Sequence, residues 1–174
     1  MLRIAPKVLL AFLGRISPEK RPDLAIRIAQ AAGLPLRIAA KLPKSENRYF
    51  CERVQPLIQG NGVDFVGEVD DTGKQSLLGA AAALLFPIDW PEPFGLVMIE
   101  AMACGTPVIA WRRGSVPEII DDGVTGFIVD TEGEAVAAIG RLAELDRRKI
   151  RATFERRFSA RRMAEDYVRI FETL

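Results

Sequence analysis

Six short, mostly apolar runs of strand length constrain the fold of this chain more than any other feature. They alternate with segments of helical pattern and span residues 8–13, 36–40, 63–66, 83–86, 107–110 and 126–129. Continuous apolar runs indicate strands buried on both faces, and strands that alternate with helices indicate a parallel sheet with right-handed crossovers. The sequence therefore predicts an α/β fold, a Rossmann-like doubly wound parallel sheet of about six strands flanked by helices.

Helical patterns separate most of these strands. Residues 22–32, 46–59 and 71–81 have helical spacing, and the first of these segments opens with Pro22 and stops at Gly33. A last, amphipathic helix has an apolar stripe with a period near 3.6. The stripe consists of Ala164, Tyr167, Val168, Phe171 and Leu174. Because such a stripe needs a covering surface, we expect the isolated chain to fold this helix back on its own domain or to form a homodimer through it.

Length and composition describe one ordinary globular domain over residues 1–174. The chain is 49% hydrophobic and has a formal net charge of +1, so no overall charge favours nucleic acid. It contains 0 histidines, which excludes Ser-His-Asp and Cys-His hydrolase chemistry built from this chain alone. Cys51 and Cys104 belong to no cluster of metal-ligand spacing, and we expect no metal.

The apolar and the basic stretches of the chain bear on its location. The longest apolar run, residues 80–88, is shorter than the ~20 residues that span a bilayer, and the N-terminus has no small-residue cleavage site. We therefore expect a cytoplasmic protein. Residues 147–162 are rich in arginine, which is most often a solvated helix face, and peripheral membrane contact is the less favoured alternative.

The loop that follows the first strand carries the first candidate site. Gly14 lets the backbone approach a ligand, and Arg15 and Lys20 then present two cations before the helix that begins at Pro22. Ligands of doubly wound sheets bind beyond the carboxyl ends of the strands, and two cations there suit a diphosphate. Taken alone, the pair also fits two exposed loop charges.

The loop after the strand at residues 83–86 carries the stronger candidate. A proline-rich segment leads into an apolar helix, whose start offers the amides of Phe94, Gly95 and Leu96 to an anion. Glu92 precedes this helix and Glu100 lies inside it, so each carboxylate can accept a pair of sugar hydroxyls. The alternative interpretation is a helix-start acid and an exposed helical glutamate. Glu100 nevertheless stands in an apolar helix, where a carboxylate requires a partner.

Other nucleotide-binding motifs are absent from the sequence. No G-x-G-x-x-G follows a strand. Residues 67–74 imitate a P-loop, but the spacing between the glycines is too long and Gln75 stands where a serine or threonine would hold magnesium.

The order of these motifs resembles the C-terminal, donor-binding domain of a family-four, or group 1, retaining glycosyltransferase of the GT-B fold. The resemblance covers most of the chain. The matching elements are Gly14 with Arg15 and Lys20, the segment 63–69, the E-x7-E pair Glu92 and Glu100, the turn 105–109, and the loops 114–118 and 122–127.

This resemblance implies roles for the candidate residues. Arg15 and Lys20 would neutralise the diphosphate of a UDP- or GDP-sugar, and Glu100 would hold the ribose. The backbone of Gly67, Glu68 and Val69 would contact the nucleobase. Glu92, with the amides of Phe94, Gly95 and Leu96, would hold the sugar and the distal phosphate. Arg15, Lys20 and Glu92 would be the catalytic residues: the two cations would stabilise the leaving diphosphate without a metal or other cofactor, and Glu92 would hold the transferred sugar.

The chain also departs from the family pattern. Residues 38–43 lack the glycine-rich turn that the family often has after its second strand, which leaves Lys41 as an additional candidate contact. The N-terminal acceptor-binding domain of the family is absent from this chain, so the resemblance implies that domain, or a separate subunit, as a partner and an isolated chain that is inactive. A stand-alone sugar-nucleotide-binding or regulatory module is the alternative, and an epimerase of the same architecture is the third.

Overall fold

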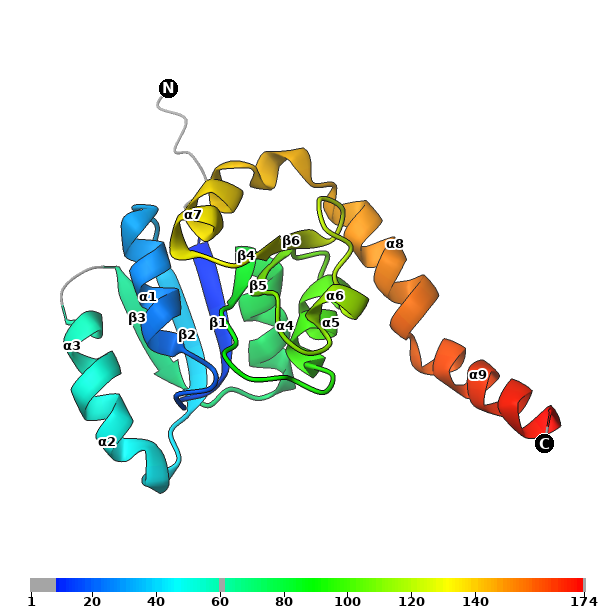
Figure 1. The fold of residues 1–174 in the computed structure, drawn as a ribbon, viewed down its shortest axis with the longest axis horizontal. Helices are drawn as coiled ribbons and strands as arrows, with labels where there is room; N and C mark the ends of the chain where they lie inside the picture. The colour runs from blue at the N-terminus through cyan, green and yellow to red at the C-terminus, as the bar shows by residue number, and fades with distance from the viewer. Residues whose placement is uncertain (1–8, 60–61, 174) are drawn as a thin grey trace.

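The computed structural model describes residues 9–59 and 62–173 and contains one parallel sheet (Figure 1). The six strands lie in the order β3-β2-β1-β4-β5-β6, and every neighbouring pair is parallel. Their bounds are β1 Leu9–Arg15, β2 Leu36–Lys41, β3 Val63–Gly67, β4 Ala81–Phe86, β5 Val108–Trp111 and β6 Gly126–Val129. The order reverses between β1 and β4, which makes the carboxyl ends of these two strands a topological switch point.

Helices cover both faces of the sheet. On one face α1 contacts α7, and on the opposite face α4 contacts α5 (Figure 1). The described α-helices are α1 Pro22–Ala31, α2 Asn47–Tyr49, α3 Gln55–Ile58, α4 Asp71–Ala80, α5 Leu96–Ala103, α6 Val116–Ile119, α7 Glu132–Gly140, α8 Arg147–Phe158 and α9 Ala160–Glu172. Short helical turns of other types are η1 Lys44–Glu46, η2 Phe50–Val54 and η3 Leu142–Glu144. The doubly wound α/β prediction is therefore confirmed.

All six predicted strands are present, with ends that shift by one or two residues. The predicted start at Val8 lies outside the described residues, and so does Leu174 of the predicted apolar stripe. The predicted helix 46–59 is right in position but wrong in regularity, because η2 is a turn of π-helix between α2 and α3. The predicted helix 71–81 ends one residue early, since Ala81 begins β4.

The core fills the space between the sheet and its two helical layers. The interiors of the two central strands are buried: the interior residues of β1 and β4 include Leu10, Ala11, Leu84 and Leu85, each at most 1% exposed. Continuous apolar runs therefore do mark strands buried on both faces, as the sequence indicates. Burial of this kind fixes the pairing of β1 with β4 and thus the position of the loops that follow them.

The C-terminal helix α9 extends away from the rest of the molecule (Figure 1). Ser159 interrupts the helical run between α8 and α9, and its side chain accepts a hydrogen bond from the Arg162 amide at the start of α9. None of the described residues of α9 is buried, and Phe171 is 70% exposed. The expectation that the helix folds back on its own domain is therefore wrong, because the break at Ser159 directs α9 away from the core.

No helix among residues 9–59 and 62–173 combines the length and the apolar character that crossing a membrane requires.

The close approach of β5 and β6 gives a stability prediction. A Cβ at Gly126 would overlap the carbonyl oxygen of Val108, so Gly126→Ala should lower the free energy of unfolding by about 1–3 kcal/mol or more. Gly133, inside α7, has nothing within 4 Å of an added Cβ, and Gly133→Ala should be neutral or stabilising by up to about 1 kcal/mol. Urea unfolding of both variants checks the pair, and an equal effect at the two positions would contradict the packing.

Candidate functional site

The loop after β1 lies at one wall of the switch point. The strand carries Gly14 and Arg15 at its carboxyl end, and the chain then turns to place Lys20 before α1. An added Cβ at Gly14 would meet only the Phe12 ring, at an ordinary contact distance of 3.9 Å, so the space above this glycine is open. Among the described residues no carboxylate forms an ion pair with Arg15, whose guanidinium is exposed. The loop therefore offers a ligand both room and positive charge.

The loop after β4 forms the second wall. It ends at Gly95, which caps α5 in the left-handed conformation (φ 76°) that favours glycine. An added Cβ there would come within 2.6 Å of Met98 Cε, so the position excludes a side chain on steric grounds as well. Because α5 begins at Leu96, the amides of Leu96 and Val97 have no partner within the helix, whereas the Met98 amide donates to the Gly95 carbonyl at 2.9 Å. This terminus suits an anion.

A direct ion pair joins the two walls. Lys20 Nζ lies 2.5 Å from Glu92 Oε2, and both side chains are largely buried, with exposed fractions of 21% and 16%. The same ammonium lies 5.7 Å from the centre of the Phe86 ring. The sequence analysis gives Lys20 and Glu92 separate tasks, whereas the structure pairs them across the switch point.

These two walls enclose a cavity of about 400 Å³. We call it the α5 cavity because it opens at the N-terminus of α5. It is lined by Leu13, Gly14, Arg15, Lys20, Phe86, Glu92, Pro93, Phe94, Gly95, Leu96 and Val97. With two cations, one carboxylate and the free amides of α5, the lining has an excess of positive charge.

A second cavity, of about 240 Å³, adjoins the first and shares Leu13, Gly14 and Val97 with it. We call it the β2 cavity, since Ala39, Ala40 and Lys41 at the end of β2 form one side. The rest of its lining comprises Glu68, Val69, Lys74 and Glu100.

The charges of the β2 cavity form two opposite pairs. Lys41 Nζ lies 4.0 Å from Glu68 Oε2, and Lys74 Nζ lies 3.5 Å from Glu100 Oε1. Glu100 therefore has the partner that its apolar helix requires, although its side chain is 39% exposed rather than buried. The balanced lining contrasts with the positive excess of the α5 cavity.

The loop that precedes α6 supports the Glu92 loop from behind. A Cβ at Gly114, where φ is 51°, would overlap the backbone of Glu92. The Ser115 amide donates to the Glu92 carbonyl at 2.9 Å, and the Ser115 hydroxyl donates to the Phe94 carbonyl at 2.8 Å. The segment 114–118, which the sequence analysis notes without a role, thus fixes the backbone around Glu92.

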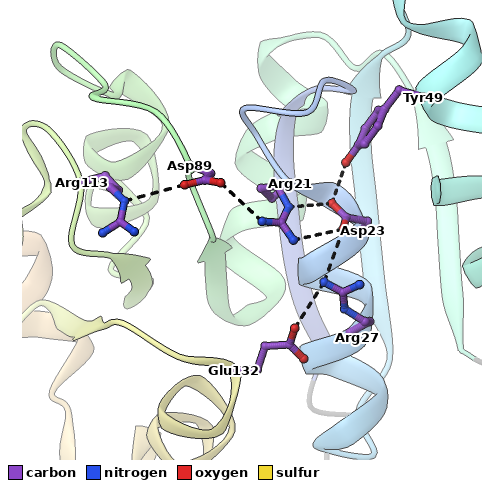
Figure 2. A network of polar contacts seen from close by, with 7 residues as sticks. All are labelled: Arg21, Asp23, Arg27, Tyr49, Asp89, Arg113 and Glu132. Carbon is purple, nitrogen blue, oxygen red and sulfur yellow. Dashed lines mark hydrogen bonds and ion pairs between the residues drawn. The ribbon is translucent and has the colours of Figure 1, made fainter.

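Next to Lys20, a buried carboxylate anchors the start of α1. Asp23 is 1% exposed and accepts hydrogen bonds from Arg21 Nε at 3.1 Å and from the Tyr49 hydroxyl at 2.6 Å (Figure 2). Burial raises the pKa of Asp23, but the hydrogen bonds from Arg21 and Tyr49 outweigh it and hold the pKa below its usual range. Asp23 is therefore ionised at neutral pH.

This anchor extends to the second wall of the site (Figure 2). Arg21, which has a left-handed backbone (φ 52°), reaches Asp89 on the loop after β4 at 3.6 Å, and Arg113 reaches the same carboxylate at 3.8 Å. The Asp89 amide also donates to the Glu19 carbonyl at 2.8 Å. On the other side of α1, Arg27 joins Asp23 to Glu132 at the start of α7. The network connects the loops that carry Lys20 and Glu92.

The structure thus gathers the candidates that the sequence analysis selects. Gly14, Arg15, Lys20, Glu92, Phe94, Gly95 and Leu96 line the α5 cavity, and Glu68, Val69 and Glu100 line the β2 cavity together with Lys41. Gly67, with a φ of 75°, immediately precedes this lining at the end of β3.

Lys74 also lines the β2 cavity but is not among the predicted site residues, because it belongs to the segment 67–74 that only imitates a P-loop. The sequence feature that could identify Lys74 as a site residue is its place in the first turn of a helix that follows the end of a strand. Over residues 9–59 and 62–173, no group of three or more His, Cys, Asp or Glu side chains could hold a metal ion.

The strand order, the switch point and the two cavities define a Rossmann-like α/β domain whose candidate site lies at the carboxyl edge of the sheet. The chain belongs to the family described as Glycosyl transferases group 1, whose sequence profile matches residues 3–158.

Relatives of known activity support this assignment. The chain is 35% identical over 188 residues to a D-inositol 3-phosphate glycosyltransferase of Saccharomonospora viridis, covering 96% of this chain and 43% of that protein. It is 36% identical over 149 residues to the enzyme of the same name from Kribbella flavida, covering 76% of this chain and 35% of that one. The chain thus spans less than half the length of these relatives.

Solved structures share the fold. Anabaena HepE, in a complex with UDP and glucose, superimposes with a TM-score of 0.84 at 23% identity, over 97% of this chain and 49% of that one. AviGT4, a glycosyltransferase involved in avilamycin A biosynthesis, gives a TM-score of 0.79 at 29% identity, over 95% and 51%. These matches confirm a group 1, GT-B type domain.

The Asp23 anchor predicts how stability depends on pH. Since the folded pKa of Asp23 is depressed, its contribution is complete above the unfolded value of about 3.9 and is lost as pH falls through the folded pKa. Asp23→Asn should lower the free energy of unfolding by roughly 1–3 kcal/mol at pH 7, and this difference should shrink below about pH 4. Urea unfolding at several pH values measures it.

Asp64→Asn is the matched control for this prediction. It removes an exposed ion pair with Arg37 between β3 and β2, and it should leave the unfolding midpoint nearly unchanged. A destabilisation by Asp23→Asn that is constant from pH 7 to pH 3 would contradict a role for the ionised carboxylate.

Proposed function

We propose that this chain is the donor-binding domain of a retaining glycosyltransferase that uses a nucleotide-diphosphate sugar. The observation that carries the proposal is the pair of adjoining cavities at the switch point, one with excess positive charge and one with balanced charge. A nucleotide sugar has the same division, with an anionic diphosphate next to a neutral nucleoside.

The diphosphate fits the α5 cavity. Arg15 and Lys20 supply two cations, and the first turn of α5 supplies amides and the positive end of the helix dipole. The ammonium of Lys20 forms an ion pair with Glu92 in this structure, and an entering phosphate competes with Glu92 for that ammonium. Such a phosphate leaves the Glu92 carboxylate oxygens available to the hydroxyls of the donor sugar.

The nucleoside fits the β2 cavity. Glu100 lies about four residues further along α5 than the anion-binding amides, which corresponds to roughly 6 Å of helix rise. A carboxylate at that distance from the diphosphate suits the ribose hydroxyls. The backbone after Gly67, with Glu68 and Val69, forms the far side of the cavity, where the nucleobase lies.

In this scheme the bond between the anomeric carbon and the diphosphate oxygen breaks, and a bond from that carbon to the acceptor oxygen forms. The leaving diphosphate takes the electron pair of the broken bond, and one of its oxygens accepts the proton that the acceptor hydroxyl loses. Arg15, Lys20 and the α5 amides stabilise the negative charge of the diphosphate as it develops, which is an electrostatic role that fixed cations fill without a metal. Attack on the same face gives retention and requires no nucleophile from the enzyme.

The acceptor site belongs to a second domain in this proposal, and the chain alone does not transfer sugar. The exposed apolar face of α9, made by Met163, Tyr167, Val168, Ile170 and Phe171, is the surface that such a domain covers. The size of the relatives, more than twice that of this chain for D-inositol 3-phosphate glycosyltransferase, supports a partner of comparable length. A cytoplasmic location remains a prediction.

Nucleotide binding tests the donor site. Calorimetry with UDP, GDP and their sugar conjugates should show binding to the wild-type chain. Arg15→Ala and Glu100→Ala should each weaken it by about 10-fold or more, because each removes a charge-assisted hydrogen bond. Addition of EDTA should leave the affinity unchanged.

Arg112→Ala controls for the loss of a positive charge. Arg112 pairs with Asp130 outside both cavities, so its removal should change the affinity less than twofold. Absence of binding at millimolar nucleotide, or equal affinities for all variants, would overturn the proposed site. Nucleotide binding with no transfer in the presence of an acceptor domain would instead favour the stand-alone binding module.

The α9 surface gives a separate prediction. Phe171→Glu should leave both nucleotide affinity and the free energy of unfolding within about 0.5 kcal/mol of wild type, because this side chain is outside the core. It should also reduce the binding of an apolar fluorescent dye to the chain, whereas Glu165→Ala on the same helix should not. If another domain covers this face, analytical ultracentrifugation should find the isolated chain monomeric, in contrast to the homodimer that the sequence predicts as the alternative to folding back. A dimer that Phe171→Glu dissociates would show that a second copy, rather than another domain, covers this face.

A further inference from the structure

Lys74 is a charged residue of the site that the donor scheme above does not use. It lies in α4, and its ammonium is 3.5 Å from Glu100 Oε1 and 3.3 Å from Asp71 Oδ1. Both Lys74 and Glu100 line the β2 cavity. Their side chains are 35% and 39% exposed, and an ion pair so exposed contributes little to folding stability. The position of this ion pair in the β2 cavity, rather than its contribution to stability, therefore indicates a role in ligand binding.

We propose that Lys74 is a specificity-determining residue that, together with Glu100, recognises the vicinal diol of ribose and makes the site prefer ribonucleotide over deoxyribonucleotide donors. This inference rests on the proposed donor function and names the class of nucleotide that the site accepts.

The chemistry of the two groups supports a diol. An ionised carboxylate only accepts hydrogen bonds and an ammonium only donates them, whereas a hydroxyl does both. A ribose diol placed against this pair on the cavity side can donate its protons to Glu100 and accept from Lys74 on an oxygen lone pair. A deoxyribose leaves one charged group without that hydrogen bond, and sites built to bond a hydroxyl reject the analogue that lacks it.

The surroundings keep Lys74 charged and close to Glu100. The carboxylate of Glu100, and then the hydrogen bond to Asp71, raise the pKa of Lys74, so it stays protonated at neutral pH. Asp71 lies outside the β2 cavity lining, and its Oδ1 lies 3.3 Å from the ammonium. Lys74 can therefore share its donors between the ligand and both carboxylates.

A phosphate is a poorer fit at this position. Each cation of the β2 cavity already faces a carboxylate, Lys41 facing Glu68 and Lys74 facing Glu100, so an anion there meets as much negative as positive charge. The neutral, hydroxyl-bearing part of a nucleotide meets no such repulsion.

The experiment compares nucleotides that differ by one hydroxyl. Calorimetry measures the dissociation constants of UDP, 2′-deoxy-UDP and 3′-deoxy-UDP, or of the guanosine series where UDP does not bind. Wild type should bind the ribonucleotide about 10-fold or more tightly than at least one deoxy analogue, the magnitude of one charge-assisted hydrogen bond. Lys74→Met should reduce this ratio to about threefold or less, mainly by weakening the ribonucleotide.

Two further variants make the result specific. Lys41→Met removes the other cation of the same cavity and should change the affinities for ribo- and deoxynucleotides equally, so the ratio persists. Lys74→Arg keeps the charge and donors and should retain the preference, which a merely structural role would not require.

The possible outcomes separate the two proposals. Nucleotide binding without a ribose preference in wild type, or a preference that Lys74→Met leaves unchanged, overturns the inference while the proposed function stands. Failure of every nucleotide to bind wild type overturns the proposed function and the inference together. Should Lys74→Met fail to fold, Lys74→Leu, which also has no hydrogen-bond donor, provides the same comparison, and a preference that it leaves unchanged also overturns the inference.

Discussion

The pairing of β1 with β4 is the contact on which the rest of the structure depends. In the register Leu10↔Ala83 and Ala11↔Leu84, these buried strands run in parallel at the centre of the sheet. The chain leaves β1 towards β2 on one side and leaves β4 towards β5 on the other, so the two following loops diverge. Their divergence opens the space that both cavities occupy. A slip of one residue would turn every side chain of a strand to the opposite face and separate the loops from their cavities.

The sequence predicts the fold and most of the residues that line the two cavities, for physical reasons that particular residues illustrate. The strands are predictable because burial on both faces leaves a continuous apolar run, as in 81–86. Arg15 and Glu100 are predictable because parallel strands bring their following loops to one edge. By contrast, the ion pair of Lys74 with Glu100 depends on how α4 packs beside α5, and no local pattern specifies lateral packing.

The absence of a local sequence signal also explains the other differences between the predictions and the structure. The break at Ser159 falls inside one continuous basic stretch, and only the observed cap on α9 marks where the direction changes. The network through Asp23 joins residues that are far apart in the sequence, since Tyr49 belongs to α2 and Asp89 to the loop after β4. Three-dimensional proximity, rather than residue type, makes these contacts.

The two cavities also differ in rigidity. Around the α5 cavity the backbone is fixed: Gly114 packs against Glu92, and Arg21 ties the loop before α1 to Asp89. The charged pairs of the β2 cavity, Lys74 with Glu100 among them, are exposed and joined only through flexible side chains. Groups that stabilise a developing charge act best when they are preorganised, whereas groups that select a ligand tolerate adjustment. In the proposed donor scheme, the division of rigidity therefore matches the division of charge, with transfer chemistry at the fixed end and recognition of the nucleoside at the adaptable end.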